Sequence, residues 1–266
     1  MTDFDAFERV MWAGRAAAYE RGFARMAAYT AEPLLDAAGV AHGTEVLDVG
    51  TGPGTVAAAA RRRGARVTAV DADPQMADVA ARNAPDVDVR VARLPDLPFS
   101  DAAFDAVVGN YVINHVGEPD VALAELRRVL RARGRLALTC WPLPRSLPQS
   151  LVNDAMERAG VGWPEDVPVT PFHTYGNPDA FRELVAGAGF PGVMVDEIVW
   201  EHVVDPDAWW AGPMAGVGST GYVLTRLDEA TIARVKAAYD ELAASYTGAD
   251  GMMRLPARAL LVHATR

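Results

Sequence analysis

Cysteine is almost absent from this chain. One cysteine, Cys140, occurs in 266 residues, which excludes an intrachain disulfide. It lies in an apolar run typical of a buried strand, where a thiol behaves as a small apolar group. Cysteine and histidine do not occur at a spacing typical of zinc ligands. We therefore expect no metal site and no redox chemistry.

Long apolar runs are also lacking. No uninterrupted stretch is long enough to span a bilayer, and residues 1–29 are interrupted by Asp, Glu and Arg, unlike an apolar leader. We expect a cytoplasmic protein without a membrane partner.

Basic residues are the minority among the charges. The chain has 25 Lys and Arg against 35 Asp and Glu, giving a net charge of −10 and a pI near 5.0. Such a surface repels nucleic acid and anionic lipid. The arginines at 61–63 and 127–133 fall late in predicted helices, where cations complement the helix dipole. We expect a small-molecule partner and no nucleic acid, and a homodimer is left open.

Glycines are concentrated after one short apolar run. Gly50, Gly52 and Gly54 separate a predicted strand at 45–49 from a helix that starts near Thr55. Without a Cβ atom, glycine permits a tight turn whose amides face a ligand, beside the positive end of the helix dipole. The spacing is G-x-G-x-G, whereas a dinucleotide turn reads G-x-G-x-x-G. The pattern therefore counts against a nicotinamide-dependent oxidoreductase.

Two acidic residues accompany this turn. Asp48 directly precedes it, and Asp71 ends the next predicted strand, about twenty residues past the turn, which suits a carboxylate that accepts ribose hydroxyls. The alternative for the turn alone is an ordinary strand-to-helix connection.

Predicted strands and helices alternate along the chain, as in an α/β fold with a doubly wound, mostly parallel seven-stranded sheet. Helices should then cover both faces of the sheet. The predicted strands are 45–49, 66–70, 87–91, 104–109, 134–141, 192–203 and 257–264, and the predicted helices are 54–63, 74–83, 119–131 and one that begins at 177.

Three segments do not belong to this sheet. Residues 1–40 are predicted to form a helical lid ahead of a main domain at 41–266. That domain has cap insertions at 142–176 and 205–250, the second with helices near 206–214 and 228–246. Their aromatic residues either line an apolar acceptor pocket or pack the cap; they are Trp163, Phe172, Tyr175, Trp209, Trp210 and Tyr222, together with Met214.

Together these motifs resemble the class I S-adenosylmethionine-dependent methyltransferases, in particular the ubiquinone and menaquinone methyltransferase-like branch and actinobacterial small-molecule enzymes. The stretches 97–108 and 110–115 match the family pattern around its fourth strand. The resemblance implies methyl transfer from S-adenosylmethionine, with S-adenosylhomocysteine as product, to an O, N or C nucleophile of a small aromatic or hydrophobic metabolite. The alternative is a non-methylating catalyst or binding protein that retains the cofactor.

The resemblance also assigns the cofactor contacts. Asp48 and the glycine turn would hold the methionine part of the cofactor, and Asp71 would hold the ribose hydroxyls. Tyr19 of the lid would cover the methionine end. Arg93 stands where many relatives have an acid, and it cannot accept the hydrogen bond from adenine, although it can stack on the base. The full set of implied cofactor residues is Tyr19, Asp48, Gly50, Thr51, Gly52, Gly54, Asp71, Ala72, Met76, Arg93, Leu94, Asn110 and His115.

Methyl transfer is an in-line displacement, in which orientation can contribute roughly 7 to 11 kcal/mol. His115 is the first candidate for a general base because imidazole titrates near neutral pH. A packing role for His115 is the alternative, and His173 is the second candidate base.

Overall fold

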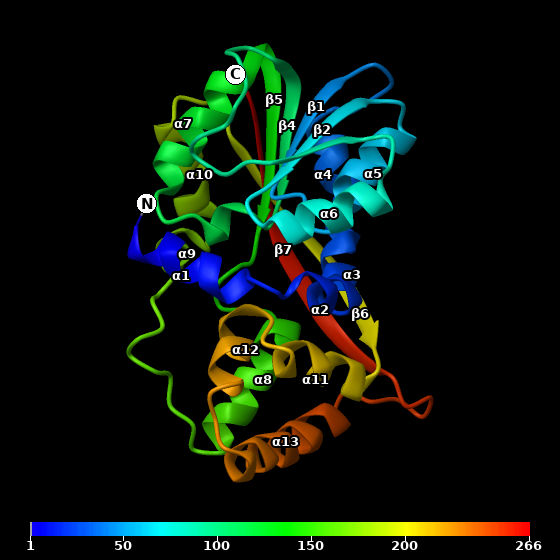
Figure 1. The fold of residues 1–266 in the computed structure, drawn as a ribbon, viewed down its shortest axis with the longest axis vertical. Helices are drawn as coiled ribbons and strands as arrows, with labels where there is room; N and C mark the ends of the chain where they lie inside the picture. Colours follow the sequence, from blue (N-terminus) through cyan, green and yellow to red (C-terminus); the bar gives the residue numbers. More distant parts are fainter. Residues whose placement is uncertain (1) are drawn as a thin grey trace.

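A seven-stranded sheet forms the centre of the molecule (Figure 1). The structure is a computed structural model that describes residues 2–266. Met1, the first residue of the predicted 1–40 lid, lies outside the described residues. The sheet order is β3-β2-β1-β4-β5-β7-β6. The strands from β3 to β5 are parallel, and β7 is antiparallel to both neighbours, which confirms the predicted doubly wound, mostly parallel sheet. The strands are β1 (Glu45–Val49), β2 (Arg66–Asp71), β3 (Asp88–Val91), β4 (Phe104–Asn110), β5 (Leu130–Cys140), β6 (Met194–Val204) and β7 (Met253–Thr265).

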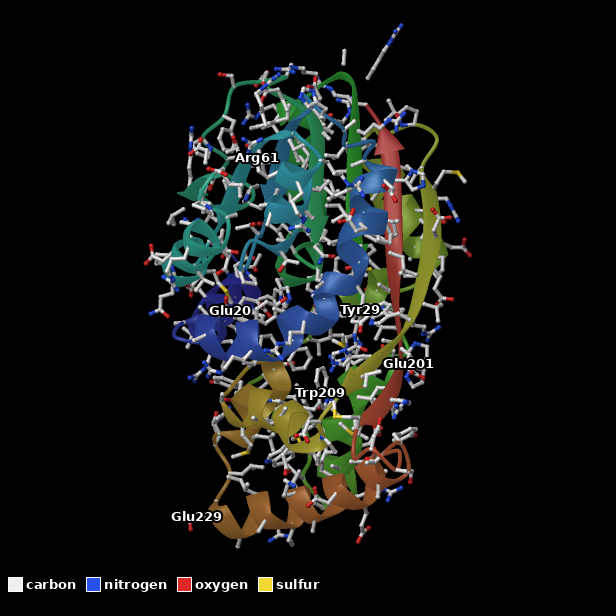
Figure 2. All side chains as sticks on the ribbon, turned by 90° about the vertical axis from the view of Figure 1, so that its right-hand side faces the viewer. Glu20, Tyr29, Arg61, Glu201, Trp209 and Glu229 are labelled. Carbon is white, nitrogen blue, oxygen red and sulfur yellow. The ribbon has the colours of Figure 1, made fainter. Side chains whose placement is uncertain are left out.

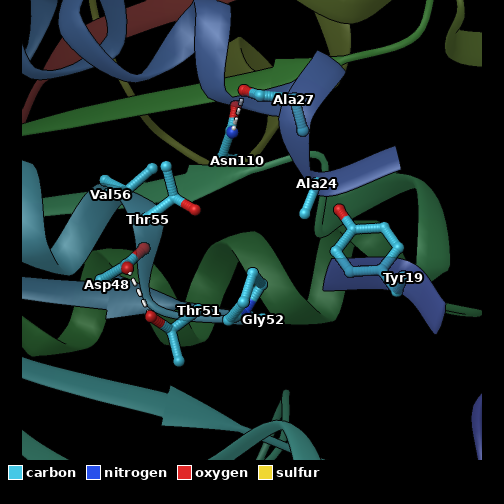
Figure 3. Close-up of a pocket in the computed structure, with 11 residues that line it drawn as sticks. Tyr19, Ala24, Ala27, Asp48, Thr51, Gly52, Thr55, Val56 and Asn110 are labelled. Carbon is cyan, nitrogen blue, oxygen red and sulfur yellow. Dashed lines mark hydrogen bonds between the residues drawn. The ribbon is translucent and has the colours of Figure 1, made fainter. Parts of the chain in front are cut away.

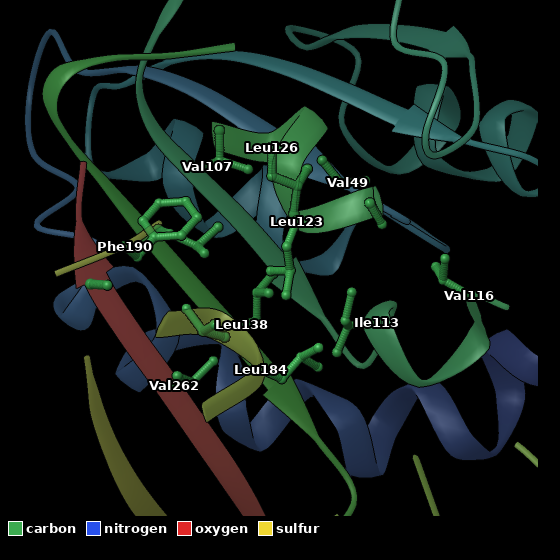
Figure 4. Packing of buried hydrophobic residues seen from close by; sticks show 14 of the residues in the cluster. Val49, Val107, Ile113, Val116, Leu123, Leu126, Leu138, Leu184, Phe190 and Val262 are labelled. Atoms are coloured by element: carbon green, nitrogen blue, oxygen red, sulfur yellow. The ribbon is translucent and has the colours of Figure 1, made fainter. Parts of the chain in front are cut away.

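Helices cover both faces of the sheet, as predicted. On one face, α4 (Ala31–Ala37) and α5 (Thr55–Arg62) bury small residues that let them approach the strands closely, and α6 (Pro74–Asn83) packs beside α5. On the other face, α7 (Pro119–Val129) and α10 (Pro178–Gly187) enclose a core of larger side chains (Figure 4). Burial of these apolar side chains is the main source of stability for the sheet. Within residues 2–266, no helix combines the length and apolarity needed to cross a membrane.

β6 and β7 extend beyond the rest of the sheet. β5 pairs with β7 only from Leu260 onward, whereas β6 pairs with β7 along its whole length. The first part of β7 is therefore one strand of a two-stranded ribbon. Pro256 is accommodated there because that stretch has no second neighbouring strand to receive its missing N–H. The predictions placed the start of β7 at 257 and the start of β5 at 134, and both starts were wrong by about four residues.

The N-terminal helices lie across the carboxyl ends of the strands (Figure 1). They are α1 (Asp3–Trp12), α2 (Ala16–Arg21), α3 (Phe23–Ala27) and the 3₁₀ turn η1 (Ala28–Thr30). α1 begins with a capping box in which the side chains of Thr2 and Asp5 each accept from the other's backbone N–H. α4, in contrast, packs on α5 and the sheet. Only the helices ahead of α4 therefore have the position expected of a lid.

Four helices form the cap around the ribbon. Two of them, α11 (Pro206–Met214) and α13 (Glu229–Ala244), match the predicted helices near 206–214 and 228–246, whereas α8 (Leu147–Arg158) and α12 (Gly218–Leu224) were not predicted. Prolines at 142–148 obscured α8, although Pro148 lies in its first turn, where proline is tolerated. The short α9 (Phe172–Tyr175) was not predicted either.

α12 forms because of packing rather than helix propensity. It contains two glycines, and a Cβ atom at Gly221 would lie 2.6 Å from the carbonyl carbon of Gly216 and 2.7 Å from the carbonyl oxygen of Pro213. Gly221 therefore allows α12 to approach the end of α11 more closely than any other residue would.

This close approach predicts opposite effects for two helical glycines. Gly221→Ala should lower the free energy of unfolding by about 1 to 3 kcal/mol, because the added methyl overpacks the α11–α12 contact. Gly187→Ala, at the exposed end of α10 with no atom within 4 Å of the added Cβ, should raise it by up to about 1 kcal/mol. Urea unfolding of the three proteins measures both changes. A gain in stability for Gly221→Ala would show that the contact is loose.

Candidate functional site

The glycine turn between β1 and α5 forms the floor of a pocket. Gly50 has a φ of 64°, and a Cβ there would clash with the Val112 side chain, so no other residue fits without displacing the loop after β4. The enclosed part of the pocket has a volume of about 30 Å³, and the pocket opens to solvent. Figure 3 shows it between the turn and α2–α3. Its walls are formed by Tyr19, Ala24, Ala27, Asp48, Gly50, Thr51, Gly52, Pro53, Thr55, Val56 and Asn110.

Asp48 is a buried carboxylate in the wall of this pocket, with 1% of its surface exposed. The Thr51 hydroxyl donates to its Oδ2 at 2.7 Å, while Oδ1 is buried and makes no hydrogen bond of normal geometry. Burial raises the pKa of Asp48 to about 7, and the hydrogen bond from Thr51 and the nearby backbone N–H of Ala57 oppose this shift. An unpaired carboxylate oxygen with this environment would be stabilised by a cationic or hydrogen-donating ligand.

Asp71 joins the turn to the end of β2. Its Oδ2 accepts from the Gly52 N–H at 2.8 Å, and its Oδ1 accepts from the Asp73 N–H at 3.0 Å. Burial raises the pKa of Asp71, although both backbone hydrogen bonds lower it. Each oxygen has a further lone pair, so the predicted contact with ribose hydroxyls remains stereochemically available.

Tyr19 brings α2 to the same turn. A Cβ on Gly52 would lie 3.6 Å from its ring, an ordinary contact distance. Burial, together with the nearby charge of Asp71, raises the pKa of Tyr19 to about 12, so the phenol stays protonated. The ring also packs with Met76 and Trp12, which places Met76 beneath the lid. Ala72, which was also predicted to contact adenine, is exposed.

Arg93 and Leu94 are not among the residues that line the pocket. Arg93 is exposed and forms an isolated β-bridge with Asp96. Their predicted contacts with adenine remain predictions. Gly54, also absent from the pocket wall, has a φ of 85° and precedes α5, where an added Cβ would lie 3.1 Å from the Cα of Ala80.

Asn110 lines the pocket, but most of its side chain is used to hold the lid. Its Oδ1 accepts from the hydroxyls of Thr30 at 2.7 Å and Thr139 at 2.6 Å, and its Nδ2 donates to the Ala27 carbonyl at 3.0 Å. The sequence did not indicate the roles of Thr30 and Ala27, because these contacts join residues about eighty positions apart.

His115 contacts the lid rather than the pocket wall. Its Nδ1 lies 2.7 Å from Glu8 Oε2, which also accepts from the Trp12 indole N–H at 2.9 Å. Nearby, the Gly117 N–H donates to Asp5 at 2.7 Å. These contacts fasten α1 to the loop after β4. Glu8 and Asp5 were missed, and no local sequence signal identifies them.

The second candidate base, His173, is exposed in α9 and is not among the pocket residues. Across residues 2–266, no cluster of three His, Cys, Asp or Glu side chains is arranged to hold a metal ion.

The raised pKa of Asp48 predicts a pH effect on folding. Its folded-state pKa of about 7 exceeds the ordinary value of 3.8, so its contribution to stability is complete below about pH 4 and is lost as the pH rises through 7. Asp48→Asn cannot titrate. Between pH 4.5 and 7.5 the free energy of unfolding should therefore fall less in this variant than in the parent, by up to about 1.4 kcal/mol per pH unit.

Urea unfolding across this range measures the difference. Asp78→Asn, which changes an exposed carboxylate of α6, serves as the control and should reproduce the parent profile. Parallel profiles for the parent and Asp48→Asn would contradict the buried, raised pKa.

Comparisons with known proteins show which proteins this chain resembles. Residues 47–138 match the family model described as methyltransferase domain. A demethylmenaquinone methyltransferase of Renibacterium salmoninarum is 37% identical over 111 residues, which cover 42% of this chain and 47% of the relative. The chain thus matches about half the length of that relative.

Solved structures share the fold across most of the chain. The YcgJ protein of Bacillus subtilis has a TM-score of 0.57 and 19% identity, covering 90% of this chain and 98% of YcgJ. The [4+2]-cyclase SpnF has a TM-score of 0.52 and 20% identity, and the match covers 89% of this chain and 80% of SpnF. Residues 47–138 are therefore similar to a methyltransferase domain, and the chain has the class I methyltransferase fold.

Proposed function

We propose that the protein transfers a methyl group from S-adenosylmethionine to an O, N or C nucleophile of a small metabolite. The observation that most directly supports this function is the buried Asp48 carboxylate. Its unpaired oxygen adjoins the glycine turn within the segment that matches a methyltransferase domain. The demethylmenaquinone methyltransferase relative supports an aromatic or hydrophobic acceptor.

The residues present fit this cofactor. Asp48 Oδ1 is available to accept from the cofactor's ammonium group, and its negative charge would be stabilised there. The glycine turn leaves room for a ligand beside the start of α5, whose positive dipole end favours a carboxylate. Asp71 is available for ribose hydroxyls, and Tyr19 covers the turn from α2.

When bound, S-adenosylmethionine supplies a methyl group on a positively charged sulfur that leaves with the bonding electrons. The chain's own residues bind, orient and shield the reactants. α2 and α3 close one side of the pocket, and Asn110 holds α3 against the sheet through the Ala27 carbonyl. Such alignment contributes more to an in-line displacement than an elaborate set of catalytic groups would.

The cofactor proposal predicts a loss of affinity in Asp71→Ala. Removing a charged acceptor for two ribose hydroxyls should cost about 1.5 to 3 kcal/mol of binding free energy, or roughly ten- to a hundredfold in Kd. Calorimetry with S-adenosylmethionine and S-adenosylhomocysteine measures the change. Asp78→Ala should bind like the parent.

Thermal unfolding of Asp71→Ala must be measured in parallel, because Asp71 also accepts from Gly52. Unchanged affinity in a folded variant, or tighter binding of NAD than of S-adenosylmethionine by the parent, would refute the assignment.

A cofactor-retaining protein that does not methylate is the second candidate. It is favoured by one observation, namely that a [4+2]-cyclase shares this fold. An assay for S-adenosylhomocysteine production over a panel of phenols, amines and carbon acids separates the two. Conversion of an acceptor without S-adenosylhomocysteine production would support the second.

Two roles remain for His115. As the proposed general base, it would use Nε2, since Nδ1 is engaged by Glu8, and His115→Gln should lower kcat about a hundredfold. As part of the contact that fastens α1, it would affect cofactor retention instead. Because the ring is not in the pocket wall, we expect the role in fastening α1. His115→Gln and Glu8→Gln should then both raise the KM for S-adenosylmethionine and leave kcat within a few-fold of the parent value.

Steady-state kinetics with both variants distinguishes these roles. Arg9→Gln changes an exposed residue of α1 next to Glu8 and should retain the parent values. A hundredfold loss of kcat confined to His115→Gln would establish the base.

A further inference from the structure

A second cavity lies in the cap. It has a volume of about 250 Å³ and opens to solvent. One water needs only roughly 10 to 15 Å³ of such space, so the cavity admits a small organic molecule. Its lining residues are Asn153, Met156 and Glu157 from one face of α8, and Val161, Gly162 and Trp163 from the loop that follows α8.

This cap cavity is separate from the cofactor pocket, with which it shares no lining residue. Figure 2 shows Glu20 of the lid helix α2 between Arg61 of α5 and Glu229 of α13. α8 packs along α13. The cap cavity therefore belongs to the part of the molecule that the lid separates from the helix after the glycine turn.

The loop that lines the cap cavity is held on both sides. Gly160 has a φ of 75°, and the Val161 N–H donates at 2.9 Å to a carbonyl in the last turn of α8, which turns the chain back across the helix. Farther along the loop, Val167 is buried in the apolar cluster of the cap, and Asp166 forms an ion pair with Arg226 at 2.8 Å. The cavity is therefore bounded by fixed elements.

Trp163 remains 43% exposed although its loop is fixed. The other five tryptophans each pack against another aromatic ring; they are Trp12, Trp141, Trp200, Trp209 and Trp210. Within residues 2–266, Trp163 has no such ring contact, and no lysine or arginine lies over its indole. Its face is therefore available to a ligand, and indole is the aromatic ring that attracts cations best.

The surroundings of the cap cavity are acidic. Residues 153–166 contain four acidic residues against one basic residue, Arg158, which follows Glu157 on α8 and so projects about 100° away around the helix. Arg226 also approaches this segment, but Asp166 balances its charge. Glu157 is exposed and makes no ion pair within the described part of the chain. Its carboxylate is thus available to a cation in the cavity.

We propose that the cap cavity binds a small organic cation whose ammonium nitrogen carries methyl or other apolar groups. The Trp163 ring and the Glu157 carboxylate attract the charge, while Met156 and Val161 contact the apolar groups. A strongly hydrated ion fits less well, because this largely apolar lining cannot replace its water. The site goes beyond the proposed function and does not depend on it.

The remaining polar group of the lining orients the ligand. The Thr220 hydroxyl of α12 donates to Asn153 Oδ1 at 2.7 Å, which fixes the amide and leaves its Nδ2 hydrogens for an oxygen atom of the ligand. A hydroxyl-bearing ammonium compound matches both the acidic and the amide side of the cavity.

The test is a titration of choline and of 3,3-dimethylbutan-1-ol into the isotope-labelled full chain at matched ionic strength. The two probes share their shape and hydroxyl group, and differ by a charged nitrogen in place of a carbon. The indole N–H resonance of Trp163, identified by its absence in Trp163→Leu, reports binding at the cap cavity. The parent should bind choline about tenfold more tightly than the neutral probe.

Three variants assign this preference to named groups, with the relaxation of the choline methyl signal as the readout. Glu157→Gln should weaken choline binding about threefold and leave the neutral probe unchanged. Trp163→Leu should weaken choline binding about fivefold. Glu165→Gln removes an exposed charge of the same loop that does not line the cavity, and it should bind both probes like the parent. All three side chains are exposed, so the variants should fold normally.

Equal affinity for the two probes in the parent, or no binding of either, would overturn the cation site. A preference for choline that persists in both Glu157→Gln and Trp163→Leu would overturn it as well. A parallel titration with saturating S-adenosylhomocysteine should leave choline binding unchanged, and loss of choline binding there would place the probe in the cofactor pocket instead. Failure of S-adenosylhomocysteine to bind would refute the proposed function and would not alter the choline titrations.

Discussion

Burial of the Asp48 carboxylate is the constraint on which the site depends. It lies at the end of β1 between strands that are buried on both faces, so water cannot solvate it. Thr51 satisfies one oxygen and leaves the other unpaired. The apolar sheet core offsets this cost, and a cationic ligand would remove it.

The same edge of the sheet holds the N-terminal helices through a few polar contacts. α2 and α3 have six and five residues, too few to be stable alone. Asn110 fixes α3 and η1, Asp71 fixes the turn that Tyr19 covers, and Glu8 fastens α1 to His115. Hydrogen bonds are more directional than apolar contacts, so they determine where the lid lies over the turn.

The β6–β7 ribbon places aromatic groups against the cap helices. Trp200 and His202 project from one face of β6, and α11 adds Trp209 against them. Leaving their polar atoms unpaired lowers stability, and the cap helices α8 and α13 compensate by burying a large apolar cluster around the ribbon.

The sequence by itself determined the sheet, the glycine turn and the two acids, because a strand period, a positive φ and a strand end are each encoded within a few neighbouring residues. It did not determine α8 or α12, whose prolines and glycines weaken the local helix signal that tertiary packing overrides. Nor did it determine the surroundings of His115, which meets Glu8 across 107 positions. Only the tertiary structure decided which residues pair across such separations, since those contacts depend on how whole elements pack and leave no local pattern.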